Sequence, residues 1–245
     1  MSPTKLLYLE NFTALISEAR VLDVFKEGER DVIILEQTVF YPQGGGQPYD
    51  RGVIESPSGK FIVEEARFVE GIVKHIGKFE QGAFAKGETV KCSVNGERRG
   101  LHSRIHSAGH LVDLAVTELN LNWTPGKGYH FPDGPYVEYA GVLTEGDKEK
   151  VKSDIERLCN KIAREGREVS ARFMSKDVMH AVCHFVPEYI PEGKPGRVVL
   201  FGDFGVPCGG THVGNLSEIK SMTIRKIKSK GDTIQVGYDV VRNQD

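Results

Sequence analysis

The sequence predicts an α+β protein, with a small N-terminal β-barrel-like domain over residues 1–95 and an antiparallel α+β domain over residues 96–245. Short apolar and β-branched segments separated by polar turns fill the first region, a pattern typical of a small barrel or sandwich. A helical apolar pattern begins near residue 96. Beyond it, strands and helices are mixed without regular alternation, which favours an antiparallel sheet over a doubly wound one.

The strands of the first region are short runs of apolar residues between polar breaks. Glu27-Gly28-Glu29-Arg30 is typical of a hairpin turn between two of them. We expect strands over residues 6–9, 19–25, 31–37, 61–68, 71–76 and 88–94.

A glycine-rich stretch, Gly44-Gly45-Gly46-Gln47-Pro48, interrupts these strands. It has two interpretations: a connection between strands, or a loop whose backbone approaches a ligand, because glycine permits close approach. The stretch matches neither GxGxxG nor a P-loop, so it gives no support for nucleotide binding.

The first helix is expected over residues 97–119. Histidines at intervals of four lie on one face of such a helix, and here they are His102, His106 and His110. The N-terminal part of the helix is basic because of Arg98, Arg99 and Arg104.

Two further helices are expected, over residues 144–164 and 175–183, with Thr144 and Ser175 as their N-caps. The turn at Asp133-Gly134 predicts a hairpin over residues 129–140. The remaining strands are expected over residues 168–173, 197–201, 218–228 and 233–241.

Composition excludes several classes of protein. The chain is 245 residues long, 39% hydrophobic and 27% charged, with a formal net charge of -2. RNA binding would therefore need a local basic patch. No apolar run approaches the ~20 residues of a membrane span, and no secretory signal is visible. The four cysteines are scattered, so we expect reduced thiols and a cytoplasmic protein that does not act at a membrane.

Two short motifs provide candidate metal ligands: His106 and His110 form HxxxH, and Cys208 and His212 form CxxxH. Either pair alone is a weak signal. Together they offer three imidazoles and one thiolate, the nitrogen and sulfur mixture that zinc prefers.

Alternatives remain open at this point. His180 and His184 are also four apart, with Cys183 between them, and we interpret them as half-buried packing residues. His102 could replace His110 as the partner of His106. Cys208 and His212 could instead be a thiol nucleophile and its base, although no third residue of the sequence orients that pair. HEXXH is absent, so no metalloprotease base is built into the motif.

His106-Ser107-Ala108-Gly109-His110, followed far downstream by Cys208-Gly209-Gly210-Thr211-His212, resembles the editing domain of alanyl-tRNA synthetases. It is also similar to the freestanding alanyl-tRNA editing proteins of the AlaX type and, more distantly, to threonyl-tRNA synthetases. The glycine-rich stretch resembles a motif in the β domain of this family. The length resembles that of the medium-sized, trans-acting editing proteins.

The resemblance implies a zinc-dependent hydrolase that deacylates mischarged tRNA(Ala), chiefly tRNA(Ala) carrying serine, with glycine as the second candidate. It implies one zinc per chain on His106, His110, Cys208 and His212. The attacking water would be positioned by zinc, with no side-chain base assigned, and no nucleotide cofactor is expected. The alternative is a zinc-stabilised RNA-binding module without catalysis. The sequence leaves open whether the protein is a monomer or a homodimer.

The resemblance also implies contacts to substrate and RNA. Trp123-Thr124 resembles a pair in the pocket of short editing proteins, so Thr124 is a candidate for binding the serine hydroxyl. The other substrate candidates are Gly44, Gly45, Gly46 and Gln47, and we expect Gln47 to touch substrate or RNA. The candidates for RNA phosphates are Arg98, Arg99, Arg104, Lys127, Arg225, Lys226 and Lys228.

Overall fold

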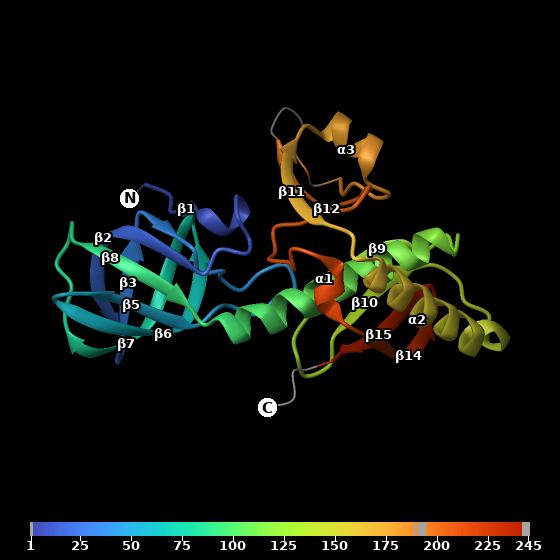
Figure 1. Cartoon of the computed structure of the whole chain (residues 1–245), viewed down its shortest axis with the longest axis horizontal. Coiled ribbons are helices and arrows are strands. Elements are labelled where there is room, and N and C mark those ends of the chain that lie inside the picture. Colours follow the sequence, from blue (N-terminus) through green and yellow to red (C-terminus); the bar gives the residue numbers. More distant parts are fainter. Residues whose placement is uncertain (1, 189, 191–194, 242–245) are drawn as a thin grey trace. The chain divides into compact units, whose positions relative to one another are not determined.

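The computed structural model describes residues 2–188, 190 and 195–241. The chain forms two compact units: the first holds the residues up to Gly44 together with Pro48–Gly100, and the second holds Gly45–Gln47 with the residues from Leu101 onward. The predicted α+β class is confirmed, because the first unit contains a closed antiparallel barrel and the second contains antiparallel sheets with helices (Figure 1).

The barrel of the first unit has the strand order β2-β3-β7-β6-β5-β8 and closes where β2 pairs with β8. Apolar side chains from its strands, among them Ile33, Leu35, Ile54 and Phe61, fill the interior and are fully buried. The strands are β2 (Ile16–Glu27), β3 (Arg30–Leu35), β5 (Gly52–Ser56), β6 (Gly59–Val69), β7 (Ile72–Gly82) and β8 (Thr89–Val94).

The prediction of a strand over residues 6–9 is wrong. Only Lys5–Leu6 forms a strand, β1, which pairs with β4 (Gln37–Thr38), and Leu7–Leu9 is a 3-10 turn, η1. Such a short apolar run does not distinguish a strand from a single helical turn. The prediction also missed β5, which completes the barrel between β6 and β8.

The main sheet of the second unit has the order β14-β15-β10-β9. Helix α1 (Gly96–Glu118) is tied to it by two buried tyrosines: Tyr139 donates to Asp113 at 2.6 Å, and Tyr238 donates to the carbonyl of Ile105 at 3.0 Å. The sheet thereby fixes the face of α1 that carries the histidines. The strands are β9 (Thr124–Tyr129), β10 (Tyr136–Ala140), β14 (Met222–Lys230) and β15 (Thr233–Val240).

A second sheet, in the order β11-β12-β13, precedes the Cys208 loop. Its strands are β11 (Val169–Met174), β12 (Gly196–Phe201) and β13 (Phe204–Pro207), and α3 (Lys176–Val182) follows β11. Because β13 ends at Pro207, Cys208 lies directly after a paired strand. The sequence did not predict β13.

Helix α2 (Lys148–Glu165) packs on β14, where Asn160 bonds both backbone groups of Met222 and Glu156 accepts from the amide of Ile224. The prediction that Thr144 caps this helix is wrong. A 3-10 turn, η2 (Glu145–Asp147), follows Thr144, and the helix starts only at Lys148. A short η3 (Leu216–Ile219) precedes β14.

Among the described residues, no helix is long and apolar enough to cross a membrane. Cys92, Cys159, Cys183 and Cys208 are all free thiols, as expected.

Candidate metal centre and adjoining pocket

The structure brings together the four candidate ligands that lie in two distant parts of the sequence. His106 and His110 lie on α1, whereas Cys208 and His212 lie on the loop after β13. One ligand atom from each lies within 4.8 Å of all the others, and this is the one such group of three or more potential ligands in the described part of the chain.

Two sulfur–nitrogen distances in this group match those around a tetrahedral zinc ion. Zinc–sulfur bonds of about 2.3 Å and zinc–nitrogen bonds of about 2.0–2.1 Å place the two ligand atoms about 3.6 Å apart. The Cys208 sulfur lies 3.5 Å from Nε2 of His106 and 3.4 Å from Nε2 of His212. Nε2 of His110 is buried and has no hydrogen-bond partner among the described residues. A bound cation would satisfy this nitrogen.

Gln47 sets the orientation and tautomer of His106. Its Oε1 accepts the backbone amide of Thr211 at 3.0 Å, and its Nε2 donates to the Thr211 hydroxyl at 2.8 Å, so the orientation of the side-chain amide is fixed. The same Oε1 lies 2.8 Å from Nδ1 of His106. That nitrogen must therefore carry the hydrogen, which leaves the Nε2 lone pair facing Cys208, as a metal ligand requires.

Asp113 orients the ring of His110 in a similar way. Its carboxylate accepts from Nδ1 of His110 at 2.9 Å and from the hydroxyl of Tyr139. Burial by itself lowers the pKa of His110, but Asp113 and the Cys208 thiolate raise it to about 10. Burial raises the pKa of Cys208, yet His110 lowers it below its ordinary value. Without a metal, the site therefore favours a Cys208 thiolate beside a protonated His110, and a bound metal ion would replace the proton on Nε2 of His110.

Two glycines of the motifs make room for imidazole rings. A Cβ on Gly210 would overlap the ring of His106, whereas Gly209 has nothing within 4 Å of such a position. A Cβ on Gly109 would come within 3 Å of the ring of His130 and of the Tyr238 hydroxyl. The glycines thus allow the helix and the loop to close around the rings.

His130 is a member of the site that sequence reasoning missed. Its ring stacks on His106 at a centroid distance of 4.3 Å, and its Nδ1 lies 2.7 Å from the hydroxyl of Tyr238. Because Tyr238 donates its single hydrogen to Ile105, it must accept from Nδ1–H of His130. Nε2 is then left with a lone pair. Burial lowers the pKa of His130 to about 3, so the ring is neutral.

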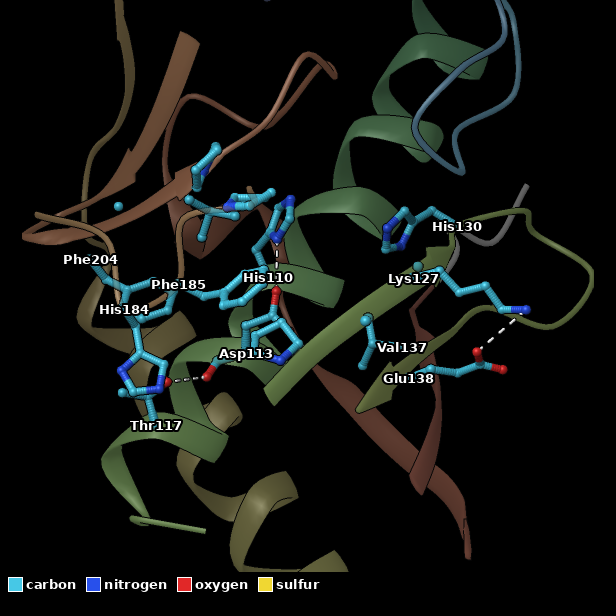
Figure 2. A pocket seen from close by; sticks show the side chains of 17 residues that line it. His110, Asp113, Thr117, Lys127, His130, Val137, Glu138, His184, Phe185 and Phe204 are labelled. Atoms are coloured by element: carbon cyan, nitrogen blue, oxygen red, sulfur yellow. Dashed lines mark hydrogen bonds and ion pairs between the residues drawn. The ribbon is translucent and has the colours of Figure 1, made fainter. Parts of the chain in front are cut away.

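A pocket of about 150 Å³ adjoins the metal group, and Figure 2 shows its lining residues. His110, Asp113 and Thr117 of α1 line it together with His130 and with Lys127 of β9. The pocket is smaller than the ~300–1,000 Å³ of sites for drug-sized ligands. It therefore suits a small group held beside His110.

Thr124 does not line this pocket. It is exposed at the start of β9 and lines a more open hollow with Trp123, and this hollow shares Pro125, His184 and Phe185 with the pocket. The threonine on the pocket wall is Thr117, whose hydroxyl donates to the carbonyl of Asp113 at 2.9 Å. Its position seven residues after His110 places it on the same face of α1.

Two residues of the glycine-rich stretch, Gly46 and Gln47, contribute to the site. Gly46 accepts the backbone amide of His130 at 2.8 Å, and its φ of +74° and its closeness to the carbonyl of Gly128 leave no room for a side chain. Gln47 is fully buried, which does not fit the expected contact with substrate or RNA. Its contacts are with His106 and Thr211 instead. Gly45 is exposed with a φ of +51°, and Gly44 lies in the first unit.

The candidate RNA contacts differ in accessibility. Arg99 is only 3% exposed and is bonded to Asp50 and to three backbone carbonyls, which does not fit the expected role in phosphate binding. Arg225 donates hydrogen bonds to the backbone carbonyls of Pro135 and Tyr238 and forms an ion pair with Asp239.

The other candidates remain accessible to differing degrees. Lys226 and Lys228 are exposed and form no ion pair within the described residues. Lys127 is 73% exposed and lies 3.4 Å from Glu138 at the pocket. Arg98 and Arg104 are half-buried.

The competing histidine pair does not form a site. His180 and His184 are exposed, so the expectation that they are half-buried packing residues is wrong. Helix α3 ends at Val182, before His184, while Cys183 turns into an apolar cluster with Met179. His102 is buried and does not join the metal group.

Comparison with known protein families gives two matches. Residues 4–98 match the family described as tRNA synthetases class II (A). Residues 197–235 match the threonyl and alanyl tRNA synthetase second additional domain, which here covers the Cys208 loop.

Similar curated proteins include alanine–tRNA ligases and an editing protein. The ligase of Methylococcus capsulatus is 32% identical over 84% of this chain and 24% of its own length, and that of Halobacterium salinarum is 32% identical over 95% and 25%. The alanyl-tRNA editing protein AlaX-L of Pyrococcus horikoshii is 29% identical over 89% of this chain and 53% of its own length. The chain thus spans about a quarter of these ligases and about half of that editing protein.

Proposed function

We propose that this chain, which belongs with the alanyl-tRNA editing proteins and the alanine–tRNA ligases, hydrolyses the ester bond of mischarged tRNA(Ala). The observation that carries the proposal is the small pocket beside His110, one of four converging candidate metal ligands. A module that only used the metal for stability would not need such a pocket. The pocket therefore favours the hydrolase over the alternative of a non-catalytic RNA-binding module.

Zinc is the metal that this donor set fits best, because one thiolate and three imidazoles match its preferences. When bound, it would supply Lewis-acid polarisation. His106 and His110 would hold it through Nε2, because Gln47 and Asp113 occupy their Nδ1 atoms. Neighbours of this kind typically alter metal affinity 10–100-fold.

The chain's own residues supply a pocket whose polar groups are few and defined. With its Nδ1 occupied by Tyr238, His130 offers only an acceptor, and its pKa of about 3 makes it too weak a base to hold a proton near neutral pH. It would therefore orient a water or hydroxyl by a hydrogen bond. No side-chain base is assigned, which is consistent with an ester that is already activated.

Serine is the preferred wrong amino acid in this proposal. An apolar pocket in a synthetase rejects an added hydroxyl only weakly, so a second site that binds the hydroxyl is useful. The Thr117 hydroxyl already donates to Asp113 and can accept a hydrogen bond from a serine side chain. His130 is a second acceptor on the same wall. Glycine would lack this interaction and would be a poorer substrate.

Deacylation of Ser-tRNA(Ala), Gly-tRNA(Ala) and Ala-tRNA(Ala) tests the proposal. We expect fast release of serine, slower release of glycine and little release of alanine. A chelator should abolish the activity and added zinc should restore it. Tight binding of tRNA(Ala) with no deacylation above the spontaneous rate would contradict the proposal and support the non-catalytic module.

A further inference from the structure

The first unit carries a cluster of arginines that the metal site does not use. Three guanidinium groups surround the ring of Tyr49: that of Arg67 at 5.3 Å from the ring centroid, that of Arg98 at 5.4 Å and that of Arg51 at 5.9 Å. Arginines this close repel one another, and the repulsion is strongest where they are partly removed from water.

Carboxylates do not neutralise this arginine cluster. Arg67 pairs with Glu65, but that carboxylate is shared with Arg30. Arg51 and Arg98 form no ion pair among the residues that the structure describes. Their Nε atoms donate instead to backbone carbonyls, Arg51 to Glu64 at 3.1 Å and Arg98 to Tyr49 at 3.0 Å.

The remaining donors of the cluster are available at the surface. Each Nε–carbonyl bond fixes one edge of a guanidinium and leaves the terminal nitrogens free to bind an anion in a bidentate manner. Arg51 is exposed, and the side chain of Arg67 is 40% exposed. Burial and the charge of Arg51 lower the pKa of Arg98 more than Tyr49 and Asp50 raise it, as expected for a guanidinium beside a like charge.

We propose that Arg51, Arg67 and Arg98, organised around Tyr49, form a phosphate-binding site for the RNA backbone on the first unit. Fixed planar guanidiniums match the geometry of phosphate oxygens. A cluster of several guanidinium groups suits a chain of phosphates better than it suits a single carboxylate. This inference rests on the proposed function only for the identity of the RNA, which we take to be tRNA.

Binding of uncharged tRNA, measured by fluorescence anisotropy from 50 to 200 mM salt, tests this site separately from catalysis. Each phosphate contact contributes about 0.9 to the slope of log K against log salt. Removing two of these contacts with the double variant Arg51→Gln and Arg98→Gln should reduce the magnitude of the slope by about 1.8. Over this fourfold change in salt, wild type should then lose about 12-fold more affinity than the variant.

A matched double variant, Lys26→Gln with Lys86→Gln, removes the same charge from exposed positions elsewhere in the first unit and should keep most of the slope. The single variant Arg51→Gln decides the matter if the double variant fails to fold, with an expected loss of about 0.9. Equal losses in the arginine and lysine variants, or an unchanged slope in Arg51→Gln, would overturn the inference.

Deacylation distinguishes this inference from the proposed function. If the arginines only bind RNA, the variants should raise KM for Ser-tRNA(Ala) and leave kcat unchanged. A reduced salt slope in a protein that deacylates nothing would keep the phosphate site and reject the hydrolase.

Discussion

Replacing Gln47 by leucine should weaken metal binding although Gln47 is not a ligand. The side chain is fully buried, and its Oε1 accepts from both His106 Nδ1 and the amide of Thr211. Leucine has a similar size but removes this acceptor, so two buried N–H groups lose their partner. Each orphaned donor costs about 1–3 kcal/mol, or about 2–6 kcal/mol in total.

Part of that cost should appear as metal affinity, because His106 would lose the bond that directs its Nε2 toward Cys208. Loss of such an orienting partner typically weakens binding 10–100-fold. Competition with a chromogenic chelator would give the zinc affinity of Gln47→Leu, and denaturant unfolding without metal would give the stability cost.

Gln43→Leu is the matched control, because Gln43 lies just before the glycine-rich stretch but is exposed. It should bind zinc like wild type. A zinc affinity within threefold of wild type in folded Gln47→Leu would refute the role assigned to Gln47.

Three further predictions follow from the same structure. Gly210→Ala should lose zinc and deacylation because its Cβ would meet the His106 ring, whereas Gly209→Ala, with open space around it, should resemble wild type in both assays. Thr117→Val should reduce kcat/KM for Ser-tRNA(Ala) by the equivalent of about 1–3 kcal/mol, while exposed Thr124→Val should not; the reverse order in deacylation assays would move the hydroxyl site to Thr124. Burial lowers the pKa of His75 in the barrel from 6.5 to about 4, so the unfolded chain takes up a proton at a higher pH than the folded one. The free energy of unfolding should thus fall as pH drops from 6.5 to 4, by about 3 kcal/mol in total, and a His75→Gln variant with the same pH dependence as wild type would contradict this.

The sequence was sufficient to identify the four candidate ligands that the structure brings together, because each pair is local: HxxxH on one helix face and CxxxH around two glycines. It was also sufficient for the fold class, since the barrel strands have clear turns. The residues that surround the candidate ligands could not be predicted in the same way, because their positions depend on contacts between distant segments of the chain. Gln47 and His106 are 59 positions apart, and His130 and Tyr238 are 108 apart.

Burial was the property that sequence reasoning predicted least well. Arg99 looked like a phosphate ligand beside Arg98, yet successive residues of a helix point in different directions. Arg99 turns inward to Asp50, whereas Arg98 lies at Tyr49. Thr124 was chosen from its neighbour Trp123, but it is exposed at the start of β9 and is not among the residues that line the pocket, whereas Thr117 is.

The placement of Gly45–Gln47 has a consequence for how this protein can be divided. These three residues come from the N-terminal half of the sequence but pack within the second unit, where Gln47 and Gly46 hold His106 and His130. A fragment that began at Leu101 would contain all four candidate ligands but would lack Gln47, which orients His106, and Gly46, which bonds the backbone of His130. The two units are therefore not interchangeable modules. The N-terminal half of the sequence supplies the second unit with the short segment Gly45–Gln47. Recombination at residue 101 would therefore preserve the HxxxH and CxxxH motifs and still impair the site.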